Sequence, residues 1–162
     1  MSISKYSVDN FPGTYSNRVF VGGAYRGIYL RRLQLISEAV KDAAFTAVNS
    51  SEFGIPPGTE REYCETILKQ CKFAIFEVTI EAGWWPEFVG ASYNHVICLS
   101  LYDKRKWAEW KNKKMSRMLT SDKQFKENNF GYLSVRGMQK AVNDFLSKYI
   151  LASDSNTHSV SS

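Results

Sequence analysis

The sequence predicts an α/β domain with a mainly parallel sheet of four to five strands and helices on both of its faces. Short apolar runs, each about as long as one buried strand, alternate with longer segments whose apolar residues recur at helical spacing. This alternation of strand and helix is the pattern that βαβ units produce. The length of 162 residues and the hydrophobic content of 44% fit one domain with a sizeable core.

The first part of the domain is predicted to be strand, helix and strand. Residues 18–23, RVFVGG, form an apolar run that ends in two glycines, which indicates a buried strand followed by a tight turn. A helix is expected from Gly27 to Asp42, because apolar residues recur there at helical spacing. Residues 44–49 predict a weaker strand, and the Ser-, Pro- and Gly-rich residues 50–59 predict a loop.

The centre of the chain is the stretch of residues 73–91, FAIFEVTIEAGWWPEFVGA. It predicts a buried strand, a short loop and the first turn of a helix. Pro86 suits that first turn, because the N–H that proline lacks would have no intrahelical partner there. Another helix is expected to precede the strand and to begin near Thr59, whose hydroxyl can cap it.

The rest of the chain completes the fold with two strands and a helix. The runs 96–102 and 130–134 predict a fourth strand and a short fifth strand. An apolar stripe from Val135 to Tyr149 predicts the final helix. The expected organisation is a flexible N-terminal arm at residues 1–17, a single domain at residues 18–150 and a disordered tail at residues 151–162.

The composition favours a soluble, cytoplasmic protein that acts on a small molecule. The net charge of +5 is modest and the sequence contains no recognised nucleic-acid-binding module, which argues against nucleic acid as the ligand. No apolar run approaches the roughly 20 residues of a membrane span, and the N-terminus has no apolar signal region. The cysteines form no C-x-x-C pair, so we expect reduced core thiols, no metal and no tightly bound cofactor.

The least regular part of the chain lies between the fourth and fifth strands. Residues 104–126 are rich in lysine and arginine, with Trp107 and Trp110 among them. We interpret the segment as a solvated helix whose tryptophans pack on the body of the domain. A basic flap over an anionic ligand and a surface for a protein partner are alternatives, and single-stranded nucleic acid is a weaker one.

Ligands of open parallel sheets bind beyond the carboxyl ends of the strands. Three segments of this chain are expected to meet there: residues 22–27, 50–59 and 77–87. The first is a glycine-rich turn that leads into a helix, so its backbone N–H groups and an arginine can hold a phosphate. Strand–helix turns use glycine for structural reasons as well. The candidate substrate-binding residues of this turn are Gly22, Gly23, Tyr25, Arg26 and Gly27.

The third segment contains the candidate catalytic carboxylates. Glu87 follows Trp84 and Trp85 in the first turn of a helix, where a carboxylate can also simply balance the helix dipole. The two tryptophans are candidate substrate-binding residues; we expect Trp84 to pack beneath the carboxylate and Trp85 to line the pocket. Glu77, a second catalytic candidate, and Glu81, which we group with the binding residues, are possible proton donors.

Two sets of short motifs carry a resemblance to known families. The first set has three parts: the run Val19-Phe20-Val21 with its turn, Pro57-Gly58 followed by the pattern of Ile67–Cys71, and Ala74-Ile75-Phe76 leading to Trp84-Trp85-Pro86-Glu87. This set resembles TIR-type domains, in which a tryptophan stands three residues before a glutamate on the third helix. The second set is Gly23-Ala24-Tyr25-Arg26-Gly27 and Glu77-Val78-Thr79. It resembles the nucleoside 2-deoxyribosyltransferase superfamily, especially the deoxynucleoside-monophosphate N-glycosidase branch.

The resemblance spans residues 18–101 and implies both a fold and a chemistry. The two families share a flavodoxin-like three-layer α/β/α sandwich, and in both the glutamate acts on the N-glycosidic bond of a nucleotide. Such domains often work as homo-oligomers in which a neighbour completes the site. The deoxyribosyltransferase pattern usually has an aspartate at the strand end where this chain has Glu77.

Cleavage of a ribosyl N-glycosidic bond builds positive charge on the sugar, which a neighbouring carboxylate stabilises or uses to activate water. Nicotinamide is a good leaving group, so one carboxylate suffices, whereas a neutral base needs a proton donor as well. We therefore expect a hydrolase or transferase that acts on NAD or a related (deoxy)nucleotide through Glu87. The alternatives are a sensor that binds a nucleotide without cleaving it, a TIR-type interaction adaptor, and a scaffold in which Glu87 is structural.

Overall fold

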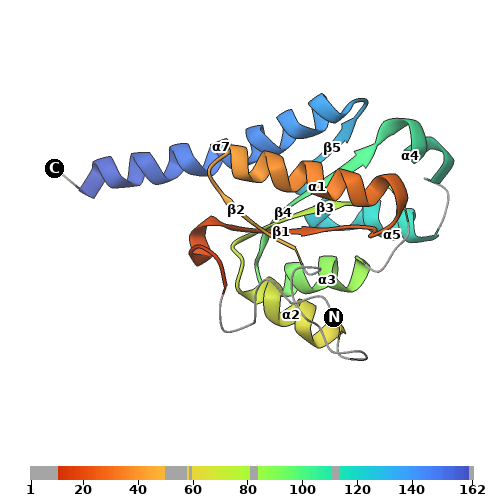
Figure 1. Cartoon of the computed structure of the whole chain (residues 1–162), viewed down its shortest axis with the longest axis horizontal. Coiled ribbons are helices and arrows are strands. Elements are labelled where there is room, and N and C mark those ends of the chain that lie inside the picture. The colour runs from red at the N-terminus through yellow and green to blue at the C-terminus, as the bar shows by residue number, and fades with distance from the viewer. Residues whose placement is uncertain (1–10, 50–57, 59, 81–83, 111–113, 161–162) are drawn as a thin grey trace.

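A computed structural model describes residues 11–49, 58, 60–80, 84–110 and 114–160. Its five strands are all parallel and lie in the order β2-β1-β3-β4-β5 (Figure 1). This is the flavodoxin-like order, in which the direction of strand addition reverses between β1 and β3. The fold class predicted from the sequence is thus confirmed. The strands are β1 (Arg18–Gly22), β2 (Thr46–Val48), β3 (Phe73–Glu77), β4 (Ile97–Asp103) and β5 (Asn129–Tyr132).

Helices α1 (Gly27–Asp42) and α7 (Val135–Val160) cover one face of the sheet (Figure 1). Apolar side chains of α1, such as Leu33 and Ile36, and of α7, such as Val142, pack on alternate residues of the strands. Because successive residues of a strand point to opposite faces, Phe73 and Ile75 of β3 face this layer.

The opposite face is covered by α2 (Glu60–Lys69), α3 (Trp85–Tyr93), α5 (Lys114–Ser121) and α6 (Lys123–Glu127). The intervening residues of β3, Ala74 and Phe76, face this second layer, where Phe76 meets Phe88 of α3 edge-on. Two apolar cores, one on each side of the sheet, make the domain a three-layer sandwich. A short 3-10 helix, η1 (Tyr15–Asn17), precedes β1, and α4 (Lys104–Trp110) follows β4 directly.

Most predicted elements agree with the structure to within a few residues, and two regions differ from expectation. The described residues between β4 and β5 form three short helices, α4, α5 and α6, rather than one solvated helix. Helix α7 continues to Val160, so most of residues 151–162, where we expected a disordered tail, is helical. No proline or glycine follows Gly137, so the sequence contains no strong signal to end that helix.

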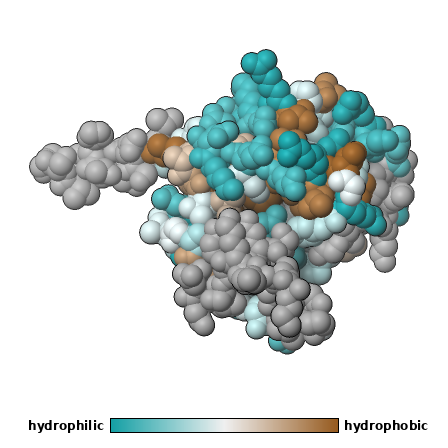
Figure 2. Space-filling view, in the orientation of Figure 1, coloured by the Kyte–Doolittle hydropathy of each residue, from teal (hydrophilic) through white to brown (hydrophobic). Residues whose placement is uncertain are grey.

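Trp107 in the basic segment packs on the domain as expected. Its indole stacks on Phe125 of α6 with ring centroids 6.0 Å apart and lies 4.7 Å from the Tyr102 ring of β4. The side chain of Trp110 lies outside the described residues. Among the residues coloured in Figure 2, hydrophilic ones predominate, with apolar residues interspersed among them.

Cys64, Cys71 and Cys98 are buried and are not joined in disulfides, as expected for reduced core residues. Burial raises the pKa of Cys71 to about 12, against the charge of Arg18. Within the described part of the chain, no helix is long and apolar enough to cross a bilayer. A cluster of three or more potential metal ligands is likewise absent from those residues.

Candidate functional site

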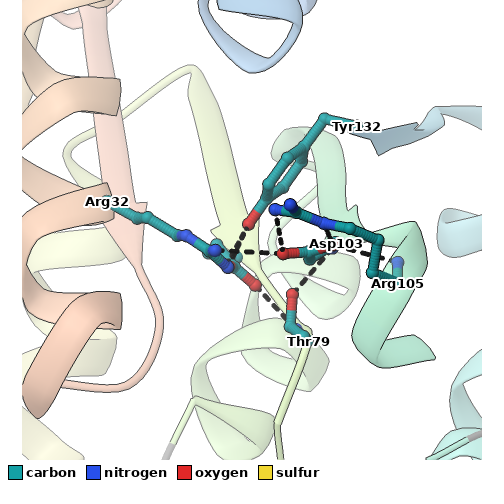
Figure 3. A network of polar contacts seen from close by, with 6 residues as sticks. Arg32, Thr79, Asp103, Arg105 and Tyr132 are labelled. Atoms are coloured by element: carbon teal, nitrogen blue, oxygen red, sulfur yellow. Dashed lines mark hydrogen bonds and ion pairs between the residues drawn. The ribbon is translucent and has the colours of Figure 1, made fainter. Parts of the chain in front are cut away.

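Three buried polar residues lie at the carboxyl ends of neighbouring strands. Glu77 ends β3, Asp103 ends β4 and Tyr132 ends β5. All three meet Arg32, which extends from the second turn of α1 (Figure 3). We call the set formed by Arg32, Glu77, Thr79, Asp103, Arg105 and Tyr132 the Arg32 network.

Glu77 is 2% exposed, and both of its carboxylate oxygens accept hydrogen bonds. The phenol of Tyr132 donates to Oε2 over 2.6 Å, and the backbone N–H of Thr79 donates to Oε1 over 2.7 Å. The guanidinium of Arg32 lies 3.6 Å from Oε2. The side chain is therefore fully engaged by the protein itself.

Arg32 joins the two acidic residues of the network. Its Nη1 donates to the Tyr132 hydroxyl over 2.8 Å, and its Nη2 donates to Asp103 Oδ2 over 3.0 Å. The guanidinium carbon also lies 5.2 Å from the ring centre of Tyr29 and 5.3 Å from that of Tyr132. Cation–π contact thus adds to the ion pairs.

Asp103 is held from several directions. Its Oδ1 accepts the backbone N–H of Arg105 over 3.0 Å and the Nε of the same residue over 3.2 Å. Its Oδ2 accepts a hydrogen bond from Arg105 Nη2 over 3.2 Å as well as the one from Arg32. The backbone N–H of Asp103 in turn donates to Thr79 Oγ1 over 2.9 Å, which links the ends of β3 and β4.

The two carboxylates of the network differ in proton affinity. Burial raises the pKa of Glu77 above its ordinary value, although the hydrogen bonds from Thr79 and Tyr132 and the charge of Arg32 oppose that rise. Burial also tends to raise the pKa of Asp103. There, however, the hydrogen bonds from Arg105 and the charges of both arginines prevail and lower the pKa. Asp103 is therefore the more firmly ionised of the two.

The glycine turn after β1 lies against this network. A Cβ atom built on Gly23 would come within 2.8 Å of Leu33 Cδ2 and 3.1 Å of the Glu77 carbonyl oxygen. Gly23 is thus required by the close approach of β1, α1 and β3. Gly27 has a φ of +56° and open space around it, so its requirement comes from the backbone conformation at the start of α1.

Tyr25 and Arg26 lie on the exposed outer part of the turn. The Tyr25 hydroxyl bonds to Asn49 Oδ1 over 3.1 Å, which ties the turn to the residue after β2. Arg26 is the N-cap residue of α1. The structure therefore places an exposed arginine where the sequence predicts a phosphate contact.

If Arg26 contacts a phosphate, Arg26→Ala should weaken binding of a phosphorylated nucleotide by about 1.5–3 kcal/mol, the range for a hydrogen bond to a charged group. Binding of the matching unphosphorylated nucleoside should hardly change. Isothermal titration calorimetry with both ligands measures the difference, and Arg31→Ala, an exposed change on the same helix, is the control. Equal weakening of both ligands would mean that Arg26 supports the turn instead of contacting the phosphate.

The two tryptophans before α3 occupy different environments. Trp84 is 1% exposed, and its indole N–H donates to the Ile80 carbonyl oxygen over 2.8 Å. Trp85 is only partly buried and stacks on Phe88, with ring centroids 5.5 Å apart and an interplanar angle of 18°. Trp84 packs in the core, and its expected place beneath the Glu87 carboxylate stays a prediction. The expected contact of Trp85 with a ligand stays a prediction.

Glu87 lies in the first turn of α3 and meets α2. The thiol of Cys64 forms a hydrogen bond with its carboxylate. The other oxygen, Oε2, is buried and has no hydrogen-bond partner among the described residues. Burial raises the pKa of Glu87, against the smaller effect of the Cys64 hydrogen bond.

The candidate residues of the sequence therefore separate into two groups. Glu77 and Gly23 lie together on the side of the sheet covered by α1 and α7, whereas Gly22 faces Phe20 and Phe76 of the other layer. Glu87 and the tryptophans belong to the layer of α2 and α3 on the other side. Glu81 lies outside the described residues.

Of the network, sequence reasoning named only Glu77 as a candidate site residue, and Thr79 only within the Glu77-Val78-Thr79 motif. It missed Arg32, Asp103, Arg105 and Tyr132. Asp103 and Tyr132 carried a usable signal, because they are polar residues at the ends of apolar strands, as Glu77 is. No protein-family model and no curated protein matches the sequence significantly. The case for a function therefore depends on the geometry at this edge of the sheet.

Proposed function

We propose that this domain is a nucleotide N-glycosidase that cleaves or transfers at the ribosyl N-glycosidic bond of NAD or a related (deoxy)nucleotide, with Glu87 as the catalytic carboxylate. The observation that carries the proposal is the buried Oε2 of Glu87, which lacks a partner among the described residues. A buried acceptor without a partner costs about 1–3 kcal/mol, and a positive sugar would supply the missing partner. Such an atom in a folded protein calls for an explanation, and a catalytic role is one of those known.

The chemistry follows from the surroundings of this carboxylate. The Cys64 hydrogen bond fixes one oxygen of Glu87 and leaves the other to face the cation that develops on the ribose. A half-buried site screens that attraction less than water does, which strengthens it. The partly exposed indole of Trp85, which stacks on the buried ring of Phe88, supports stacking of a flat base.

The contacts and position of Glu77 favour NAD as the substrate over nucleotides whose bases are poorer leaving groups. Both oxygens of Glu77 are engaged, and the side chain lies in the other layer from Glu87. It is thus poorly suited to give a proton to a departing base at Glu87. A nicotinamide leaving group does not need that proton.

The test is release of free base. Purified protein is incubated with NAD and a panel of nucleotides, and the products are separated by chromatography. Glu87→Gln keeps the volume of the side chain and removes its charge, so turnover should fall by at least a hundredfold, on the order expected when a charge-stabilising group is lost. Glu65→Gln, an exposed change on α2, is the matched control and should retain full activity. Full activity of Glu87→Gln would end the catalytic assignment.

A second candidate function is a sensor that holds a nucleotide without cleaving it. The full engagement of Glu77 favours it, because a domain that only binds needs no free proton donor at the carboxyl edge. Tight binding of NAD by calorimetry without release of nicotinamide would favour this reading over the first.

We also propose that the protein is a cytoplasmic homo-oligomer and that the basic residues 104–126 bind a protein partner. Two exposed apolar side chains support self-association: Phe130 of the edge strand β5 and Leu133, which follows that strand. Sedimentation velocity measures the oligomeric state directly, and a monomer at micromolar concentration would exclude this part of the proposal.

A further inference from the structure

Arg105 is an exposed arginine that a buried carboxylate holds in one orientation. Its side chain is 63% exposed, whereas that of Asp103 is 2% exposed. Nε and Nη2 of Arg105 each lie 3.2 Å from a different oxygen of Asp103. This two-point contact fixes the plane of the guanidinium as well as its position.

The negative charge of Asp103 is already matched by another arginine. Arg32 donates to the same Oδ2 over 3.0 Å from a far more buried position. Two guanidinium groups therefore share the carboxylate of Asp103, and Arg32 also lies 3.6 Å from Oε2 of Glu77. Nη1 of Arg105 makes no contact among the described residues, so donors remain for another acceptor.

The ion pair between Arg105 and Asp103 contributes little to the stability of the fold. The side chain of Arg105 is exposed, and exposed ion pairs contribute about 0–1 kcal/mol. The clearer physical effect of the pair is orientation: an arginine held by its Nε edge presents its remaining N–H groups to a planar or tetrahedral anion. The group lies at the carboxyl end of β4, on the sheet edge where ligands of this architecture bind.

We propose that Arg105 binds the phosphate group of the nucleotide ligand, with Asp103 as the positioning residue that holds its guanidinium. This inference rests on the proposed function and deepens it, because it assigns the anionic part of the ligand to the end of β4. The base and sugar then extend along the edge toward β3 and α3.

Two matched pairs of probes test this directly: nicotinamide mononucleotide with nicotinamide riboside, and AMP with adenosine. Each pair differs only by the phosphate. In calorimetry, Arg105→Gln should weaken binding of both phosphorylated probes by about tenfold to a hundredfold, as expected for loss of a charged hydrogen bond. Both unphosphorylated probes should bind as they do to the unaltered protein.

Two further variants separate orientation from charge. Arg105→Lys keeps the charge but loses the two-point contact, so phosphate binding should fall to an intermediate level. Lys106→Gln removes one charge from the neighbouring exposed position and should change neither pair of probes. Asp103 itself is left unaltered, because its loss would also leave Arg32 buried without its acidic partner.

The outcomes distinguish this inference from the proposed function. Equal weakening of phosphorylated and unphosphorylated probes, an equal effect of Lys106→Gln, or an unaltered protein without preference for the phosphorylated probes would overturn the role of Arg105. Nicotinamide release is measured in the same samples. If Arg105→Gln selectively weakens the phosphorylated probes and no base is ever released, the inference stands and the glycosidase proposal fails.

Discussion

Replacing Arg32 with methionine is expected to lower the free energy of unfolding by about 3–5 kcal/mol, the range for removal of one partner from a buried ion pair. The side chain of Arg32 is 13% exposed, and it meets Glu77 and Asp103, whose side chains are 1% and 2% exposed. Methionine fills much of the space but leaves both carboxylates without their buried cation. The phenol of Tyr132 also loses the donor that bonds to its oxygen.

Urea denaturation followed by circular dichroism measures this change, and Arg31→Met is the matched control. Arg31 is the preceding residue on α1, its side chain is 63% exposed, and its nearest carboxylate, Glu38, is 4.0 Å away. Loss of such a surface pair should change stability by less than about 1 kcal/mol. If the two variants unfold at the same urea concentration, the Arg32 network does not stabilise the fold.

Trp84→Ala is expected to destabilise the domain by about 3–5 kcal/mol, the range for truncation of a buried large aromatic side chain. The indole lies among Trp85, Phe88 and the rest of the second core, and its N–H satisfies the carbonyl oxygen of Ile80. Truncation therefore opens a cavity and leaves the Ile80 carbonyl without its donor.

Trp85→Ala is the comparison, because that indole is only partly buried. It should change the melting temperature much less, and it should reduce the rise in melting temperature that NAD produces in the unaltered protein. Differential scanning fluorimetry with and without NAD reads both effects. A larger loss of stability for Trp85→Ala than for Trp84→Ala would show that the two roles are exchanged.

Local patterns in the sequence were sufficient to predict all five strands, most of the helices and their order along the chain. The predicted bounds of α1 agree with the structure. The apolar residues at helical spacing begin after the glycine turn and stop before the polar residues at the end of the helix. The segment between β4 and β5 was harder to predict, since its three short helices have too few turns for a clear period.

The candidate site was only partly predictable, because its contacts join residues that are far apart in the chain. Arg32 and Tyr132 are separated by 100 positions, Arg32 and Asp103 by 71, and Glu77 and Tyr132 by 55. No local spacing reveals such pairs. Glu77 and Glu87, in contrast, are close in sequence but lie in different layers, because the side chain of Glu77 points to the face opposite α3.

The hydrogen bond from Tyr132 to Glu77 has a consequence for the newly made chain. During synthesis β1, β3 and α1 leave the ribosome long before β5, so Arg32 and Glu77 exist for some time without the phenol that both of them contact. A carboxylate buried at that stage would lack one of its donors, which disfavours its burial. The carboxyl edge of the sheet therefore acquires its final form only once Tyr132 has been translated and β5 has docked beside β4.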